Sequence, residues 1–408
     1  MMRPKLRFAP GQGLNYPAYT FKTLADVCEI RREIVDLSNF SDVQFVEYSM
    51  PAFDSGKKPK VIFGSEAKSG RISICGDVLL FNKLNVRKKR IWNVRNSPDN
   101  SVCSAEFMPV IATGVLQDYM YYAVSTDGFT KAVEECSSGT SNSQKRITPS
   151  IFLEQKIACP CSQEQQKIAA FFTVLDERMD LAEKELVLTE KISSVIFEQI
   201  YRGDLRLSRF DGTPFPAWQT RKLDQLLSFQ NGINASKEQF GTGIKLVSVK
   251  EVLSKAPVTY DGIESYINVD DKLAKRFSVE YGDVIFQRCS ETAEEAGSAN
   301  VYLDSRPAVF GGFVIRGKQK ADYHPQFIKM ALRSHKVRRQ IVRLAQGAQH
   351  VNIGQEQLSS VEIKFPCLEE QKKIAELISY FEHKEELLVQ KLNALKRLKQ
   401  AFMQQMFV

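Results

Sequence analysis

Two long stretches of the chain alternate apolar and polar residues with the period of an amphipathic helix. In residues 366–408, apolar side chains recur every seven residues, at Phe381, Leu388, Leu395 and Phe402. Residues 160–203 show the same spacing, at Leu175, Ala182, Thr189 and Ile196, with Leu188 on a neighbouring stripe. A narrow apolar seam with a period of seven residues favours packing against a second helix. The pattern therefore predicts two long helices, each of which packs against another helix.

Both predicted helices begin just after a proline, with acidic residues in the first turn, as helix N-termini favour. At 1.5 Å per residue, a helix of about 35–40 residues spans roughly 50–60 Å. Because such a helix would overhang a single domain, we predict that the two form an intramolecular coiled coil. The interface is predicted to contain Leu175, Ala182, Leu188, Ile196, Phe381, Leu388, Leu395 and Phe402. The alternative is that each helix packs only on its own globular domain.

The chain contains an internal repeat. Ile157-Ala-Cys-Pro-Cys161 aligns with Ile363-Lys-Phe-Pro-Cys367, and the match continues without a gap to the ends of both helices. Upstream, Gly76-Asp-Val78 matches Gly282-Asp-Val284, and residues 117–139 follow residues 325–347. Near the start of each copy, Tyr16-Pro-Ala-Tyr19 resembles Phe215-Pro-Ala-Trp218, and the preceding Arg7-Phe8 aligns with Arg209-Phe210. Matches in one order indicate two copies of one unit.

Each copy combines short strand-like runs, such as residues 78–81 and 284–286, with a helical stretch at 117–137 or 325–346. An α+β fold with two globular domains fits this pattern. We expect five segments: a first domain (1–159), a first helix (160–203), a connector (204–216), a second domain (217–365) and a second helix (366–408).

The formal net charge of +8 is concentrated in the two predicted globular parts. Residues 1–160 carry 21 Lys and Arg against 16 Asp and Glu, and residues 204–366 carry 23 against 18. Two basic domains fit two stretches of polyanion, although a mildly basic surface alone has the same composition. No apolar run is long enough to span a bilayer. We see no secretory signal at the N-terminus, and the eight scattered cysteines indicate reduced thiols, so we expect a cytoplasmic protein.

The sequence resembles the specificity subunits of type I restriction-modification enzymes. The resemblance rests on the order and duplication of several short motifs, which cover nearly the whole chain. The motifs are Pro4-Lys-Leu-Arg-Phe8, the connector from Gly203 to Trp218, Gly282-Asp-Val-Ile-Phe-Gln-Arg-Cys-Ser-Glu-Thr292, and the two helix starts with Pro, Glu-Gln and Ile-Ala.

This resemblance implies two pseudo-symmetric target recognition domains separated by two long antiparallel helices. Each domain would read one half of a bipartite, asymmetric site in double-stranded DNA. Two methyltransferase subunits, which use S-adenosylmethionine, and motor-endonuclease restriction subunits would be the protein partners. The chain itself would hold no cofactor and no metal and would catalyse nothing.

DNA binding of this kind needs cations for phosphates and polar side chains for base edges. Candidate phosphate contacts in the first domain are Lys83, Arg87, Lys88, Lys89, Arg90 and Arg95. Those in the second are Arg288, Arg333, Lys336, Arg338, Arg339 and Arg343. Candidate base-reading or loop contacts are Asn85, Ser143, Gln144, Lys145, Gln287, Gln349, His350 and Asn352. The alternative for each cluster is an ordinary solvated surface.

Motifs for catalysis are not evident. The sequence has no phosphate-binding loop, no dinucleotide fingerprint and no Asn/Asp-Pro-Pro-Tyr/Phe motif, and its four histidines lack metal-ligand spacing to cysteine. A protein-interaction scaffold without DNA readout would share the repeat and the helices, so this class stays open as the alternative. Salt-dependent retention of the assembled complex on DNA distinguishes the two.

Overall fold

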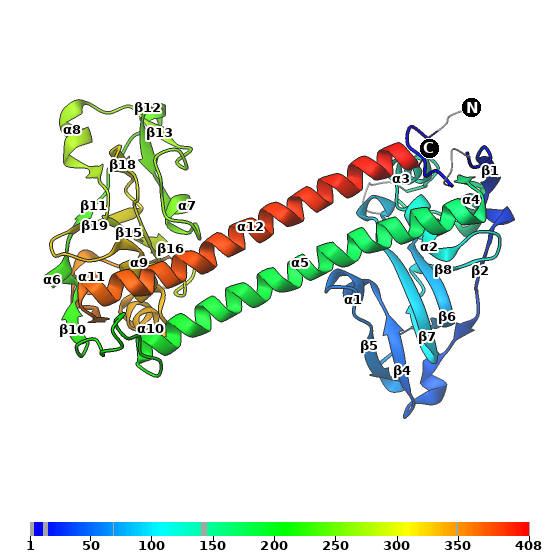
Figure 1. The fold of residues 1–408 in the computed structure, drawn as a ribbon, viewed down its shortest axis with the longest axis horizontal. Coiled ribbons are helices and arrows are strands. Elements are labelled where there is room, and N and C mark those ends of the chain that lie inside the picture. The colour runs from blue at the N-terminus through cyan, green and yellow to red at the C-terminus, as the bar shows by residue number, and fades with distance from the viewer. Residues whose placement is uncertain (1–3, 11–14, 68, 140–144, 348–349, 408) are drawn as a thin grey trace. The chain divides into compact units, whose positions relative to one another are not determined.

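The computed structural model describes residues 4–10, 15–67, 69–139, 145–347 and 350–407. The chain divides into two compact units, of which the first comprises Met1–Glu183 with Gln390–Val408 and the second Lys184–Val389. Each unit contains a mixed α/β globular part and a portion of both long helices (Figure 1).

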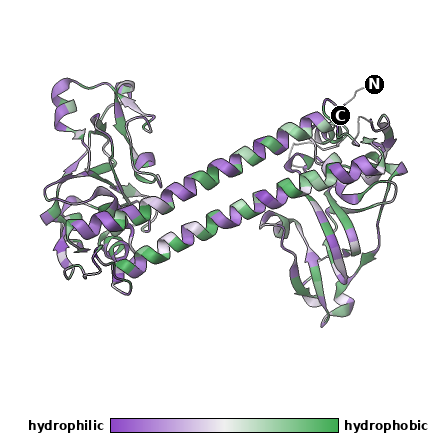
Figure 2. Cartoon of the chain, viewed as in Figure 1, coloured by the Kyte–Doolittle hydropathy of each residue, from purple (hydrophilic) through white to green (hydrophobic). Residues whose placement is uncertain are grey.

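The predicted long helices are α5 (Ser162–Arg202) and α12 (Leu368–Met406), with 41 and 39 residues. Hydrophobic and hydrophilic residues alternate along both (Figure 2). In the first unit, Lys399 pairs with Asp176, and Lys396 Nζ lies 3.4 Å from Glu183 Oε1. Residue numbers rise along one helix as they fall along the other, so the two helices are antiparallel within this unit.

The second unit contains the other portions of the two helices. Lys384 Nζ lies 3.1 Å from Glu185 Oε1, and Phe197 shares a hydrophobic core with Ile378. The order of these contacts along the chain is again antiparallel.

Most residues predicted at the helix interface are at least partly buried. Leu175, Ala182 and Leu388 are buried, and Phe381 is half-buried. Ile196, Leu395 and Phe402 are partly buried and pack against the cores of their units.

Leu188 was predicted at this interface, and that prediction is wrong. Its side chain is 56% exposed, whereas Thr189 is buried. Consecutive residues point about 100° apart around a helix, so burial of the stripe through Leu175, Ala182 and Thr189 turns Leu188 outward. The polar Thr189 thus occupies a buried seam position at which the seven-residue pattern favours an apolar side chain.

One set of elements, which we call the shared base, supports the long helices in both units. In the first unit β1 pairs antiparallel with β9, and a sheet contains strands in the order β2–β8–β6–β7. In the second unit β10 pairs antiparallel with β21, and the order β11–β19–β15–β17 repeats the same arrangement. The strands of the first base are β1 (Thr20–Thr23), β2 (Cys28–Ile30), β6 (Arg71–Asn82), β7 (Ile91–Ser104), β8 (Phe107–Ala112) and β9 (Lys156–Cys159). Those of the second are β10 (Gln219–Lys222), β11 (Leu227–Asn231), β15 (Val284–Gln287), β17 (Ala299–Val301), β19 (Val314–Gln319) and β21 (Glu362–Phe365).

The predicted strands at 78–81 and 284–286 lie in β6 and β15 and are confirmed. The predicted helices at 117–137 and 325–346 are each broken into two. The first is α2 (Gln117–Val124) followed by α3 (Asp127–Glu135), and the second is α9 (Pro325–Arg333) followed by α10 (His335–Leu344). The breaks fall at Thr126, whose hydroxyl accepts from Phe129 N, and at Ser334, which has extended backbone angles. Both residue types favour helix N-caps, which compete with helix continuation.

The remainder of each globular part differs, and we call it the unit-specific part. In the first unit, strands β3, β4 and β5 extend the base sheet. In the second, a separate sheet has the order β13–β12–β18–β14. The first set comprises β3 (Ile34–Val35), β4 (Gln44–Tyr48), β5 (Lys60–Phe63) and α1 (Met50–Asp54). The second comprises β12 (Phe240–Val247), β13 (Tyr266–Ile267), β14 (Ser278–Val279), β18 (Ala308–Phe310), α7 (Val249–Val252) and α8 (Asp271–Arg276). The duplication therefore preserves the base and changes what it carries.

A buried glutamine joins the start of each long helix to its base. Gln165 Oε1 accepts from Leu116 N at 2.9 Å, and its Nε2 donates to Pro160 O at 2.8 Å. Gln371 repeats both contacts, with His324 N and Pro366 O at 2.9 Å. This explains why Glu-Gln follows proline in both copies.

The preceding glutamates are buried as well and hold the segment that leads into each base. Glu164 forms an ion pair with Arg7 at 2.6 Å and accepts from the Tyr19 hydroxyl. Burial is the largest cause that raises the pKa of Tyr19. Glu370 accepts from Trp218 Nε1 at 2.9 Å, and Arg206 lies 3.8 Å from it.

These contacts correct one alignment of the repeat. Arg7 donates to Pro17 O, as Arg206 donates to Pro216 O, and Leu6 N donates to Gln405 O, as Leu205 N donates to Gln199 O. The structural equivalent of Arg7-Phe8 is therefore Arg206-Leu207. The choice of Arg209-Phe210 was wrong because it relied on two identical letters. Phe210 is 98% exposed.

A second contact joins each long helix to a helix of its own shared base, α2 in the first unit and α9 in the second. Tyr122 donates to Asp176 at 3.0 Å in the first unit. In the second unit, the fully buried Lys329 donates to Glu382 at 3.0 Å, and Gln326 donates to the other carboxylate oxygen at 2.7 Å. Burial lowers the pKa of Lys329. Each long helix is therefore held at two points along its axis.

Replacing Gln371 by leucine should destabilise the second unit by about 2 kcal/mol, because two buried backbone groups lose their partners. Calorimetric thermal unfolding of the full chain measures this loss. The control is Gln390→Leu on the exposed face of the same helix, which should leave the unfolding temperature nearly unchanged. Equal effects of the two substitutions would contradict the anchoring role.

Candidate functional site

Three segments of the first unit meet where β6 ends. Lys83 N donates to Glu106 O at 2.9 Å, and Lys83 O accepts from Ile147 N at 3.0 Å. The end of β6, the turn between β7 and β8, and the segment before α4 (Pro149–Glu154) are thereby joined. Lys83 lies at the centre of this junction.

The second unit repeats the junction with other side chains. Arg288 N donates to Phe313 O at 2.8 Å, and Arg288 O accepts from Ile353 N at 3.0 Å. Arg288 is thus the structural equivalent of Lys83, and Phe313 that of Glu106. The junction places a cation at the same point of both units, surrounded by different neighbours.

The loops predicted to read bases also reach these junctions. In the first unit, Asn85 N donates to Lys145 O at 2.9 Å. In the second, β16 (Cys289–Ser290) pairs with β20 (Val351–Asn352), and the exposed Asn352 side chain donates to His350 O, just before α11 (Gln355–Ser360). Gln144, Ser143 and Gln349 lie outside the described residues. The structure therefore brings together Lys83, Asn85 and Lys145 in one unit, and Arg288, His350 and Asn352 in the other.

Glu106 and Phe313 were not among the residues predicted from sequence. The carboxylate of Glu106 accepts two hydrogen bonds from Arg146, at 2.9 and 3.0 Å. The ring of Phe313 is 68% exposed. The available signal was indirect: Gly76-Asp-Val78 and Gly282-Asp-Val284 mark the same strand in both copies, but this match pairs Lys83 with Cys289, one residue away from the register of the two sheets. The turns that meet those strand ends have no matching letters.

Partial burial lowers the pKa of the Lys83 ammonium, and the nearby Glu106 carboxylate opposes this shift. The Arg146 to Glu106 pair is half-exposed, and such surface pairs contribute less than about 1 kcal/mol. A competing anion could therefore displace Glu106 at little cost.

Most of the other cations predicted in the first unit have carboxylate partners. Arg87 pairs with Glu134, Lys89 with Asp127, Arg90 with Asp54, and Arg95 with both Asp77 and Asp118. Lys88 is exposed and has no ion pair within the described part of the chain. The first cluster is hence less positive than its sequence indicates.

Three predictions for the second unit need correction. Arg333 donates to the carbonyls of Ala299, Lys255 and Ser254, and Arg338 to those of Gly297, Glu294 and Ala296. Burial lowers the pKa of both guanidinium groups. Gln287 is 3% exposed and donates to Cys289 O. These side chains hold loops of the unit together, so their polar groups are occupied within the protein and do not serve as DNA contacts.

The other cations of α10 remain available. Lys336 and Arg339 are exposed, and with Arg343 they line a groove of about 740 Å³ beside the end of α5. No carboxylate lies within ion-pair distance of any of the three, as far as residues 145–347 and 350–407 are concerned. The equivalent helix α3 contains Asp127, Glu134 and Glu135 instead. The two bases therefore differ in charge at this helix.

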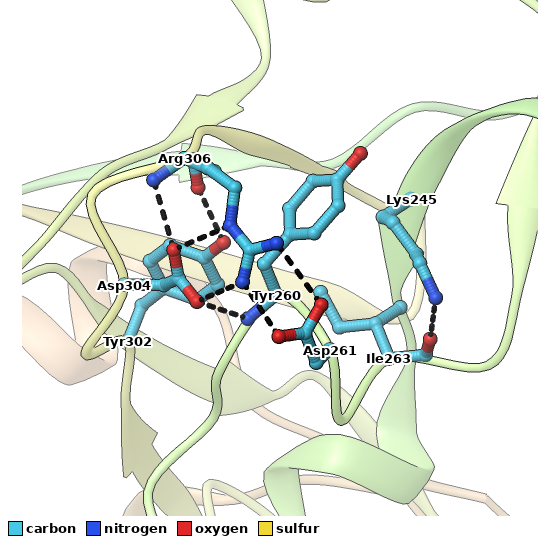
Figure 3. A network of polar contacts seen from close by, with 7 residues as sticks. All are labelled: Lys245, Tyr260, Asp261, Ile263, Tyr302, Asp304 and Arg306. Atoms are coloured by element: carbon cyan, nitrogen blue, oxygen red, sulfur yellow. Dashed lines mark hydrogen bonds and ion pairs between the residues drawn. The ribbon is translucent and has the colours of Figure 1, made fainter.

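A network of ion pairs stiffens the unit-specific part of the second unit (Figure 3). Arg306 binds Asp261 at 2.8 Å and Asp304 at 2.9 Å. Asp304 also accepts from Tyr260 N, and the Tyr302 hydroxyl donates to Arg306 O. The hydrogen bond from Arg306 holds the pKa of Asp304 well below its usual range. The network joins the loop after Val258 to the segment before β18.

Among the described residues, no cluster of His, Cys, Asp and Glu could hold a metal ion. No helix in this described part of the chain is long and apolar enough to cross a membrane.

Two copies of one α/β base, each tied to a portion of both long helices, define an internally duplicated two-domain protein. Residues 18–190 and 217–397 match the family model of the type I restriction modification DNA specificity domain. The chain belongs to this family. The predicted family and α+β fold are thereby confirmed, and a specificity family agrees with the predicted non-catalytic class.

Individual relatives are distant. The chain is 23% identical over 199 residues to the type I restriction enzyme MjaIX specificity subunit of Methanocaldococcus jannaschii. The alignment covers 45% of this chain and 44% of that subunit, so the chain matches less than half the length of this curated relative.

Two solved structures share the fold. A chain described under "Structural basis underlying complex assembly and conformational transition of the type I R-M system" has a TM-score of 0.60, 18% identity and coverage of 95% and 97% of the two chains. The type I restriction-modification system S subunit from M. genitalium has a TM-score of 0.58, 13% identity and coverage of 100% and 99%.

Substitution of Asp304 by asparagine should lower the unfolding temperature of the second unit at neutral pH, and this difference should shrink in acid. A carboxylate whose pKa is lowered by folding stabilises the fold above its unfolded pKa, near 3.9, and loses this effect as the pH falls further. Calorimetry at a series of pH values checks this. Asp322→Asn, at an exposed site, is the control. A difference that stays constant from pH 7 to pH 2 would refute the assignment.

Proposed function

We propose that this chain is the DNA-reading subunit of a type I restriction-modification complex. Each unit reads one half of a bipartite, asymmetric target in double-stranded DNA. The chain catalyses nothing itself, and methyl transfer and cleavage belong to partner subunits.

The observation that carries this proposal is that the same base supports two different unit-specific parts. A pair of identical readers would favour a symmetric site, since identical surfaces make identical contacts. Here one base continues into β3, β4 and β5, whereas the other carries a separate sheet. Two different readers on equivalent bases suit two different half-sites.

The surfaces available for DNA are narrower than the sequence indicated. Exposed Lys88, Lys336, Arg339 and Arg343 suit phosphates, which supply most of the salt-dependent affinity. The junctions at Lys83 and Arg288 suit base edges, because each combines a cation with neighbours that differ between the units. Arginine favours guanine, and asparagine favours adenine.

The two long helices would act as a spacer and as the docking surface for partners. At 1.5 Å per residue, α5 extends over about 60 Å, and one turn of B-DNA is about 34–36 Å. Two methyltransferase subunits that use S-adenosylmethionine, and motor-endonuclease subunits, would assemble on this scaffold in the cytoplasm. The length of the helices would then set the gap between the half-sites.

Exchanging residues 217–357 for the corresponding segment of a related subunit should change one half-site and leave the other intact. The shared base lets the new reader fold on the old helices. Adenine methylation mapped in cells that carry the chimera and its methyltransferase gives the result. A chimera that changes both half-sites would refute independent reading, and a wild-type complex that DNA does not retain at low salt would favour the scaffold alternative.

Adding seven residues to α5 and seven to α12, at positions that face each other, should widen the gap and preserve both half-sites. Seven residues are two turns of a coiled coil, so the apolar seam keeps its register. Methylation mapping again reads the target. Adding two residues instead turns the later part of the helix by about 200° and should abolish recognition. Altered half-sites with an unchanged gap would contradict the spacer role.

A further inference from the structure

A cleft of about 710 Å³ opens beside Arg288 in the second unit. Its walls come from the loop after β11, the turn before β19, strand β12 and strand β20. The side chains that matter below are Asn234, Phe240, Arg288, Phe313 and Asn352. The cleft therefore lies where the shared base meets the unit-specific part.

Two glycines, Gly232 and Gly312, allow the backbone segments at this cleft to approach each other. A Cβ atom on Gly232 would lie 2.1 Å from Gly311 O, and one on Gly312 would lie 2.2 Å from Asn234 Oδ1. Because glycine has no Cβ atom, the two loops come close enough for Gly232 N to donate to Val314 O and for Ile233 N to donate to Phe310 O. The two loops are thus fixed to one another by their backbones.

Phe313 is held at its backbone while its ring faces solvent. Its carbonyl accepts from Arg288 N at 2.8 Å, yet 68% of the residue is exposed. Phe240, which also lines the cleft, is 51% exposed. Two exposed phenyl rings on one cleft do not stabilise the isolated chain. A ligand with an apolar face would cover them.

Polar groups complete the lining. Arg288 Nη1 lies 3.4 Å from Gly312 O, a weak contact that leaves most guanidinium N–H groups free for a ligand. Asn234 and Asn352 are exposed. Aromatic rings together with arginine and amide donors match a nucleobase, which has apolar faces and a polar edge.

The first unit has different chemistry at the same point. Glu106 replaces Phe313 and Lys83 replaces Arg288, and Arg146 holds the carboxylate. An acidic side chain accepts from the amino group of cytosine, which an aromatic ring cannot do. Residues that are equivalent in position and different in type are where two readers on one base would differ in preference.

We propose that this cleft is a nucleobase site that determines part of the second half-site. A base of the second half-site, flipped out of the duplex stack so that its face is free, lies against Phe313 and Phe240 and turns its edge toward Arg288 and Asn352. This inference rests on the proposed function, because it requires that the second unit contacts DNA.

The test uses the chain assembled with its methyltransferase subunits and duplexes that carry single base substitutions in the mapped target. Phe313→Ala should weaken binding of the cognate duplex by about tenfold, within the range of base–aromatic contacts. Arg288→Ala should relax the preference at one position of the second half-site. Preferences in the first half-site should not change.

Tyr281→Ala is the matched control, because Tyr281 is 62% exposed in the same unit and does not line the cleft. It should bind every duplex like the wild type. Unfolding temperatures equal to wild type exclude loss of folding for each variant.

The two levels of the argument fail differently. If the wild-type complex distinguishes no sequence, the proposed function fails, and the nucleobase site fails with it. If the wild-type complex reads a split target, while Phe313→Ala and Arg288→Ala match the control at every position, only the nucleobase site is overturned.

Discussion

The architecture depends on a buried glutamine in the first turn of each long helix. Gln165 and Gln371 each accept from a backbone N–H of the base and donate to the carbonyl of a proline. A buried amide that satisfies two backbone groups is costly to replace, because no apolar side chain can do the same. The direction of each helix is thereby fixed relative to its own base. Whatever the unit-specific part presents is consequently positioned with respect to that helix.

The long helices and the duplication could be predicted from sequence, because both leave periodic or repeated letters. Of the residues predicted for the seam, Leu175, Ala182 and Leu388 are buried, whereas Leu188 is exposed. Hydrophobicity alone cannot choose between adjacent stripes when a buried position is occupied by a polar residue such as Thr189. The break between α2 and α3 at Thr126 was not predicted either. The residues on both sides follow a helical pattern, and this pattern hides the preference of the threonine for a helix cap.

The candidate site was harder to predict, because charge in a sequence says nothing about partners. Arg333 and Arg338 looked like phosphate contacts, yet their guanidinium groups bind carbonyls of their own unit. Phe313 and Glu106 carry no motif, and their equivalence follows only from the backbone hydrogen bonds to Arg288 and Lys83. Contacts between segments far apart in sequence depend on the fold, so sequence patterns could find the equivalent strands but neither their exact register nor their neighbours.

One backbone contact at a helix end occurs in both units, but the segments that form it are connected differently. In the first unit the two segments are far apart in the sequence, whereas in the second they are neighbours along the chain. Leu6 N reaches Gln405 O in the same way that Leu205 N reaches Gln199 O a few residues along the chain. Packing around a helix end is thus indifferent to whether the incoming strand is joined to that helix by peptide bonds. A duplicated protein of this kind can change its connectivity during evolution, by fission into half-length chains or by relocation of its termini, without changing the interior of either unit.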